Sequence, residues 1–298
     1  MSGILVAVDG SASAAAAVTV AAEHAARAAE ALTVVHVVEP ALIGRPHGPD
    51  PLPDAVAAAH TAGPGVEIRA LGRTGPIDDV LVELARDHDL LVVGSRGHGA
   101  VRDAALGSHA VALAAAAPCP VLVVRPGAER HRPGGPVVAA LRGDPTRDEP
   151  VLDVAFAEAT LRGVPVVLAH GVSRGVPVRR LALAALATLT VGGTDHGPDL
   201  RAHARRWIER HPDVEVRTEV RPGAAAAALL EAARGASLIV LGTRGRGTRA
   251  GLVLGSVSQA VLHHAHSLVL LVPPLLVPPL PVPPPGGPDS KGSRVPRQ

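Results

Sequence analysis

Two glycine-rich segments carry the residues best suited to binding a ligand. In the first, Gly94 and Gly97 follow an apolar run at residues 90–93. Gly107 and Ser108 come after nine further residues. Glycines let a backbone approach a phosphate closely, and a helix that begins at Ser108 adds unpaired N–H groups and a partial positive charge. The pattern predicts a polyphosphate cradle.

The second glycine-rich segment repeats the first in register. Residues 66–126 align without a gap on residues 214–274, at a constant offset of 148. The matching residues of the second loop are Gly242, Arg244, Gly245, Gly255 and Ser256. A single loop of this kind is more often only a tight turn between a strand and a helix, but repetition at the same spacing favours a binding function.

Two common phosphate motifs do not fit. The chain has no Gly-Lys-Ser or Gly-Lys-Thr, so it is not a P-loop nucleotide hydrolase. Each glycine loop follows the fourth expected strand of its copy, whereas a dinucleotide fingerprint follows the first.

The elements that must position these loops alternate between strand and helix. The first copy predicts strands at 3–8, 32–38, 66–71, 90–94 and 121–124, and helices at 12–30, 53–60, 76–88 and 108–117. Such alternation indicates an α/β protein with a parallel sheet whose strands are buried on both faces. The second copy begins with a strand at 137–141 and has 15 additional residues, with an expected extra helix at 181–189.

The two copies, the segment between them and the Pro-rich end divide the chain into four parts. We expect a first domain at 1–126, a linker at 127–135, a second domain at 136–272 and a Pro-rich, disordered tail at 273–298.

Composition excludes several classes of protein. Hydrophobic residues make up 47% of the 298, so a sizeable core is available. A net charge of only +2 predicts no nucleic-acid-binding face. The single cysteine rules out a disulfide framework, and no apolar run reaches the ~20 residues of a membrane helix. We expect a cytoplasmic protein without a membrane partner.

The glycine spacing, repeated twice, resembles the universal stress protein family in its tandem form. The run Val6-Ala7-Val8-Asp9-Gly10-Ser11 at the front strengthens the resemblance, which covers residues 1 to about 272. It implies two doubly wound domains, each with a five-stranded parallel sheet of order 3-2-1-4-5. It also implies ATP binding in many members, with or without Mg²⁺, a dimeric arrangement and a part in stress responses.

The resemblance carries nucleotide-binding positions onto both copies. In the first copy they are Ala7, Val8, Asp9, Val37, Val93, Gly94, Arg96, Gly97, Gly107 and Ser108. In the second they are Gly242, Arg244, Gly245, Gly255, Ser256, Val257 and Ser258. His109 is a departure, because many nucleotide-binding members have a small apolar residue there.

The second copy departs further from the pattern. Arg142 stands where the first copy has Asp9, and Gly171 replaces Val37. A permanent cation cannot accept hydrogen bonds as a carboxylate does. We therefore expect one working nucleotide site and one degraded site, with a phosphate contact by Arg142 as the alternative.

Other reactive residue types are better explained by structure. The histidines at 263, 264 and 266 lie at a helix end without nearby acids, which disfavours a metal site. Cys119 precedes a buried strand and is expected to pack there. The arginines at 244, 246 and 249 lack the aromatic residues that single-stranded RNA binding uses.

The sequence thus predicts an ATP-binding stress-response regulator or sensor with no catalytic residue. Its two domains would form an internal pseudo-dimer through the strands at 121–124 and 268–272, with a homodimer and a protein partner left open. The alternatives are a nucleotide-free interaction scaffold of the same fold and a slow ATPase.

Overall fold

The computed structural model describes residues 3–39, 49–96, 107–125, 127, 134–172, 197–243 and 254–274. Its strands are β1 (Ile4–Val8), β2 (Leu32–Val38), β3 (Ile68–Thr74), β4 (Leu90–Gly94), β5 (Val121–Val124), β6 (Val137–Leu141), β7 (Val166–Val172), β8 (Val216–Pro222), β9 (Leu238–Gly242) and β10 (Leu268–Val272). Its helices are α1 (Ala12–Ala28), α2 (Leu52–Ala62), α3 (Ile77–Leu84), the 3₁₀ turn η2 (Ala85–Asp87), α4 (Ser108–Ala116), α5 (Pro145–Arg162), α7 (Gly197–His203), α8 (Arg205–Arg210), α9 (Ala225–Ala232) and α10 (Ser256–His264).

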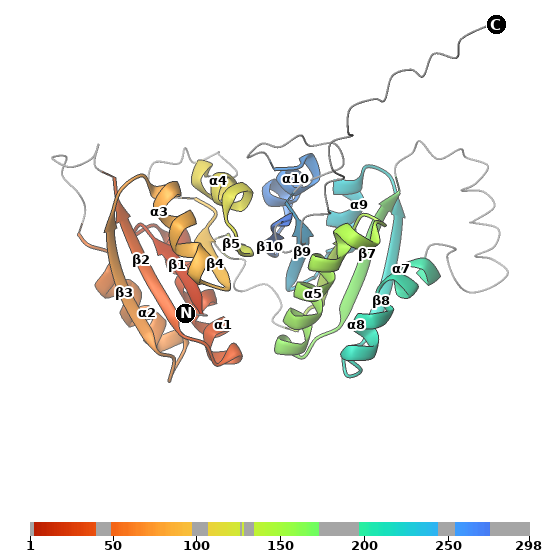
Figure 1. Cartoon of the computed structure of the whole chain (residues 1–298), viewed down its shortest axis with the longest axis horizontal. Helices are drawn as coiled ribbons and strands as arrows, with labels where there is room; N and C mark the ends of the chain where they lie inside the picture. Colours follow the sequence, from red (N-terminus) through yellow and green to blue (C-terminus); the bar gives the residue numbers. More distant parts are fainter. Residues whose placement is uncertain are drawn as a thin grey trace, which may run out of the picture.

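One ten-stranded sheet runs through both halves of the chain, in the order β3-β2-β1-β4-β5-β10-β9-β6-β7-β8. Each half therefore has the expected order 3-2-1-4-5, and its strands are parallel. The halves join where β5 pairs antiparallel with β10, in the middle of Figure 1. This pairing confirms that the last strands of the two copies meet.

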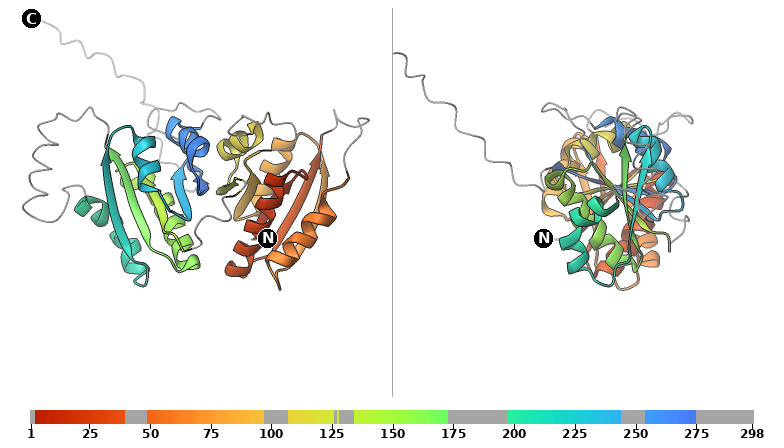
Figure 2. Two further views of the ribbon diagram at one scale, coloured as in Figure 1. Left: turned by 180° about the vertical axis from the view of Figure 1, so that it is seen from behind. Right: turned by 90° about the vertical axis from the view of Figure 1, so that its right-hand side faces the viewer.

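Helices cover both faces of the sheet, as the views of Figure 2 show. Alternation along β1 separates the two cores: Ile4 and Val6 belong to the cluster beneath α1, α2, α5, α7 and α8. Leu5 belongs to the cluster beneath α3, α4, α9 and α10. Strands buried on both faces explain why runs such as residues 90–93 are continuously apolar.

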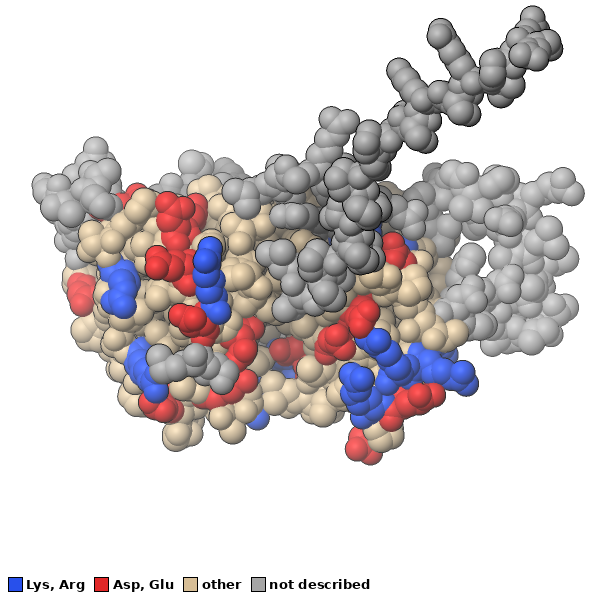
Figure 3. Space-filling model, in the orientation of Figure 1, with Lys and Arg blue, Asp and Glu red and all other residues tan. Residues whose placement is uncertain are grey.

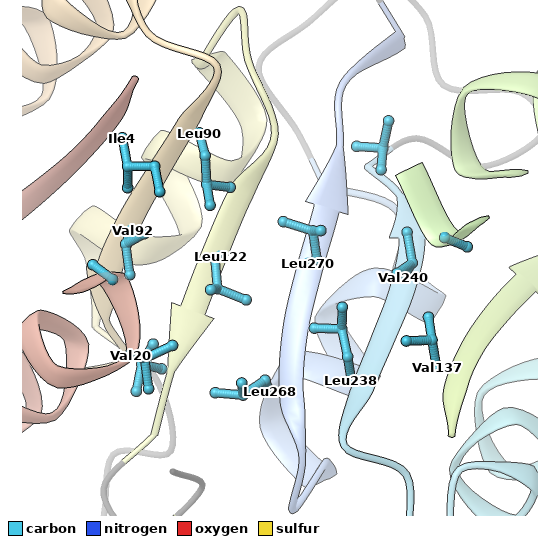
Figure 4. Packing of buried hydrophobic residues seen from close by; sticks show 14 of the residues in the cluster. Ile4, Val20, Leu90, Val92, Leu122, Val137, Leu238, Val240, Leu268 and Leu270 are labelled. Atoms are coloured by element: carbon cyan, nitrogen blue, oxygen red, sulfur yellow. The ribbon is translucent and has the colours of Figure 1, made fainter. Parts of the chain in front are cut away.

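The junction between the halves is part of this core. Leu122 and Leu270 are partners across β5 and β10, and each is 1% exposed. Figure 4 shows both within the row of buried side chains that crosses the sheet. Arg125, just after β5, donates from Nη1 to the backbone oxygens of His263 and Ala265, at 2.9 Å each. The first half thus caps the last helix of the second.

The structure places one strand and one helix of the first half at other boundaries than the sequence predicts. The strand expected at 66–71 is β3 at Ile68–Thr74, because it pairs with β2 as far as Val38. The helix expected at 76–88 ends at Leu84 and continues only as the turn η2. The helix expected at 181–189 and nearly all of the tail lie outside the described residues.

Charges of both signs are mixed on the face that Figure 3 shows. Around α8, Arg206 pairs with Glu149, and Arg205 Nε lies 3.3 Å from Glu209 Oε1. Among the described helices, none is both long and apolar enough to span a bilayer.

Candidate functional site

Asp9 and Gly94 flank the topological switch point of the first half. Asp9 directly follows β1, and Gly94 ends the neighbouring strand β4. Strand order reverses here, since β2 lies on one side of β1 and β4 on the other. In open α/β sheets, ligands bind in the crevice beyond the carboxyl ends of the strands at such a point.

Hydrogen bonds connect Asp9 to the glycine loop. Its Oδ1 accepts the backbone N–H of Ser11 at 3.0 Å. The hydroxyl of Ser11 caps α1 by accepting the N–H of Ala14, and it lies 3.3 Å from the carbonyl oxygen of Arg96, to which it donates. The acid therefore lies in the loop that contacts the first residues of the glycine segment.

Gly94 is a glycine because α1 passes very close to it. A Cβ at this position would lie 2.8 Å from both the carbonyl carbon and Oγ of Ser13. Ser13 is buried, accepts the N–H of Arg96 at 3.2 Å and donates to the carbonyl oxygen of Val124 at 3.4 Å. Helix packing alone thus requires the first glycine of the loop.

A backbone hydrogen bond joins the two ends of the glycine loop, at Ser95 and Gly107, and polar donors lie at both ends. Gly107 donates its N–H to Ser95 O at 2.7 Å and directly precedes α4, whose N-terminus has no side-chain cap. Within the described part of the chain, Ser95 Oγ and Arg96 Nε are buried without a hydrogen-bond partner. Ser108, the first residue of α4, is exposed. Unpaired N–H groups at a helix start, beside an arginine, suit an anion.

The remaining positions of the first half line the same edge of the sheet. His36 donates from Nδ1 to Val8 O at 2.8 Å, which joins the ends of β1 and β2. Val37 is half-buried at the end of β2, Ala7 is half-buried in β1, and Val93 is 4% exposed. Gly97 lies outside the described residues.

The second half keeps the same turn but fills it differently. Gly10 and Gly143, at equivalent turns, both have positive φ, of 82° and 77°. Arg142, however, directs its guanidinium over the end of β9, with Nη2 3.5 Å from Gly242 O. A Cβ on Gly242 would lie 3.1 Å from that Nη2. The arginine thus covers the end of β9 from the position at which the first half has Asp9.

Asp148 occupies the turn of the second half, a position that the sequence analysis does not identify. It is 1% exposed, and its carboxylate accepts backbone N–H groups from Arg142, Gly143 and Asp144 at 2.8 to 3.1 Å. Burial raises the pKa of Asp148, and these three N–H donors oppose the rise without cancelling it. The loop at the start of α5 therefore already holds an internal anion. The only hint in the sequence is an acid four residues after the capping Asp144.

The other second-half positions have packing partners. Gly171, where the first half has Val37, is needed because a Cβ there would lie 2.8 Å from the Cα of Ala225 in α9. Ser258 is buried and donates to Gly242 O at 2.9 Å. Gly255 donates its N–H to Thr243 O at 2.8 Å and directly precedes α10, in which Ser256 is exposed and Val257 is half-buried. Arg244 and Gly245 lie outside the described residues.

Cys119, which the sequence predicts to pack beside a buried strand, belongs to the hydrophobic core. Cys119 is 6% exposed, and burial raises the pKa of its thiol to about 11. A thiol in that state is a packing group rather than a nucleophile. Among the described residues, no three His, Cys, Asp or Glu side chains are grouped so as to hold a metal ion.

Comparison with known proteins gives one consistent family. The sequence model of the Universal stress protein family matches twice, at residues 1–125 and 135–273. A universal stress protein of Mycolicibacterium smegmatis is 32% identical over 295 residues, which cover 91% of this chain and 97% of that protein. One from Mycobacterium tuberculosis is 35% identical over 222 residues, covering 72% of this chain and 68% of that protein. The crystal structure of a universal stress protein from Archaeoglobus fulgidus has a TM-score of 0.64 at 16% identity, covering 91% and 98% of the two chains, and thus shares the fold.

Proposed function

The chain belongs to the universal stress protein family, and from that premise we propose that its first half binds ATP and acts as a nucleotide-dependent regulator in a stress response. The nucleotide would occupy the switch point beyond β1 and β4. The second half would be a degraded site that contributes to the fold and to the shape of the molecule.

The observation that carries this proposal is the contrast between the two equivalent loops. Beside the first loop lie the acid Asp9 and the buried Nε of Arg96, which has no hydrogen-bond partner among the described residues. The starts of α4 and α10 are alike in lacking a side-chain cap. Beside the second, Arg142 covers Gly242 and the carboxylate of Asp148 takes three N–H groups. An incoming phosphate would have to compete with that carboxylate.

These donors suit a nucleoside triphosphate. Arg96 and the first turn of α4 would hold phosphate oxygens, since both present N–H donors near the glycine loop. Asp9 would accept hydrogen bonds from ribose hydroxyl groups. Bound ATP would place negative charge and new contacts at the switch point, through which a partner could sense occupancy.

One observation favours a nucleotide-free scaffold as the second candidate. The contact of Gly94 with Ser13 accounts for that glycine without any ligand. If the other loop glycines also serve only the turn, the protein would act through surface contacts alone.

Calorimetric titration with ATP distinguishes the two candidates. The variants are Gly97→Glu and Gly245→Glu, each of which adds bulk and negative charge to one loop. Gly72→Glu is the matched control, because Gly72 lies on β3 and a Cβ added there would meet no atom within 4 Å. Nucleotide carried over from purification is first extracted and identified, and thermal unfolding checks that each variant is folded.

The proposal expects ATP binding by the wild type and by the Gly72 and Gly245 variants, and loss of binding by Gly97→Glu. No binding by a nucleotide-free wild type would overturn it and leave the scaffold. Loss of binding only in Gly245→Glu would move the site to the second half.

A further inference from the structure

An Asp–His pair links α4, the helix that follows the glycine loop of the first half, to α3. His109 Nδ1 lies 2.8 Å from Asp78 Oδ1. His109 is in the first turn of α4, directly after Ser108, and Asp78 is in the first turn of α3. The pair is therefore next to the uncapped helix start where the proposed function places phosphate.

The pair contributes little to holding the fold together. The side chains of His109 and Asp78 are 50% and 40% exposed, and ion pairs exposed to this degree contribute little to stability. The second half folds with the same topology and has neither residue: Val257 and Ala226 occupy the equivalent positions. Both members thus occur only in the half to which the proposed function assigns the nucleotide.

The geometry restricts which nitrogen of His109 can bind a ligand. An ionised carboxylate only accepts hydrogen bonds, so Nδ1 carries the proton in the bond to Asp78. Nε2 can then donate to a phosphate only when the ring is an imidazolium ion, in which both nitrogens carry hydrogen. Histidine changes its charge between about pH 5 and 8, so this contact depends on pH.

The charged groups that face His109 come from one neighbour. Within the described residues, α4 packs mainly against α3 and β5, and β5 consists of Val and Leu only. α3 contributes Asp78 and the exposed Asp79 in its first turn, and α4 has no acid in its own first turn.

We propose that His109, oriented by Asp78, donates from Nε2 to the terminal phosphates of the bound nucleotide. This makes the affinity of the first half depend on pH and on the number of phosphates. The inference rests on the proposed function, because it needs a nucleotide at the loop. It extends that function by assigning a side chain that senses both proton concentration and the phosphate chain.

The test is calorimetric titration of the full chain with ATP and with AMP, at about pH 6 and about pH 8. The expected wild-type result is ATP binding roughly three- to tenfold tighter at the lower pH, with AMP affinity much less affected. Repeating the ATP titration in buffers of different ionisation enthalpy should show proton uptake on binding.

Three variants assign the effect to the pair. His109→Gln should lose the pH dependence and the proton uptake while still binding ATP, because Arg96 and the N–H groups at the start of α4 remain. Asp78→Asn should reduce the proton uptake. His60→Gln is the matched control, since His60 is an exposed histidine on α2, and it should behave like the wild type.

Two outcomes distinguish a failure of the His109 inference from a failure of the proposed ATP binding. If the wild type binds ATP with the same affinity at both pH values, and His109→Gln does not differ, this inference is wrong and the proposed function stands. If the nucleotide-free wild type binds no ATP at either pH, the proposed function fails and the inference fails with it.

Discussion

His24 of α1 and Glu158 of α5 form a buried bond between the two halves of the molecule, with Nε2 2.8 Å from Oε1. Arg162 completes the group, since its Nε and Nη2 donate to the other carboxylate oxygen at 3.0 and 2.7 Å. The group has no symmetric copy, because the equivalents of His24 and Glu158 are both alanines, at 157 and 25. It therefore joins two similar halves in one specific way.

Removing the charge of Glu158 should destabilise the protein. Glu158→Gln leaves Arg162, whose side chain is 9% exposed, without its counter-charge. Loss of one partner of a buried pair costs about 3 kcal/mol or more in the free energy of unfolding. Glu23→Gln is the matched control, because it breaks the exposed pair of Glu23 (48% exposed) with Arg27 (38% exposed). It should change the free energy of unfolding by less than about 1 kcal/mol. Urea unfolding measures both, and equal effects would refute the assignment.

Glu158 and Asp148 should affect the acid stability of the protein with opposite signs. Burial raises the pKa of Glu158, but the bonds from His24 and Arg162 outweigh burial and leave this pKa below its ordinary value of 4.5. Its stabilisation is complete above that value and is lost as the pH falls through the folded-state pKa. Burial raises the pKa of Asp148 above 3.8, so protonation in the folded state relieves a cost as the pH falls.

Urea unfolding of the variants between neutral and acidic pH checks these signs. Relative to the wild type, Glu158→Gln should lose less stability on acidification, and Asp148→Asn should lose more. Parallel pH profiles for the wild type and both variants would show that neither carboxyl acts as described.

Equivalent glycines of the two halves should differ in their tolerance of a methyl group. At Gly94 the added Cβ meets Ser13, including its backbone, at 2.8 Å, so Gly94→Ala should lose about 1–3 kcal/mol in the free energy of unfolding. At Gly242 the nearest atom is the flexible end of Arg142 at 3.1 Å, which can move, so Gly242→Ala should lose less.

Gly72→Ala is the control for this pair of variants. Its Cβ meets nothing within 4 Å, and the change should be neutral or stabilising by about 0.4–1 kcal/mol. Chemical denaturation ranks the three. Equal losses at Gly94 and Gly242 would mean that the close passage of α1 does not determine the glycine at 94.

Cys119 should be unreactive in the folded protein. With a thiol pKa of about 11 and 6% exposure, only about one thiol in a thousand is ionised near pH 8, and it is shielded. A disulfide reagent should therefore label native protein far more slowly than the same protein in guanidinium chloride. The unfolded chain is its own control, because Cys119 is the only cysteine. Labelling of the native protein at the unfolded rate would contradict the buried position.

Short-range patterns in the sequence determined the architecture. The apolar run at residues 90–93 and the alternation of strand and helix predicted a parallel sheet buried on both faces, as β4 and its neighbours confirm. The register of the two glycine loops predicted the duplication. These features can be predicted from the sequence because hydrophobic periodicity and turn residues act over a few neighbouring positions.

Tertiary structure alone decided what surrounds the loops. Arg142 departs from the pattern of the first copy, which the sequence shows. Its hydrogen bond to Gly242, however, joins residues 100 positions apart in the chain. The role of Asp148 depends on the folded turn at Gly143, where its carboxylate accepts three backbone N–H groups. The contact of Gly94 with Ser13 and the bond of His24 with Glu158 likewise join distant segments. No local propensity encodes such contacts, because they depend on how closely helices approach the sheet and each other once the core has packed.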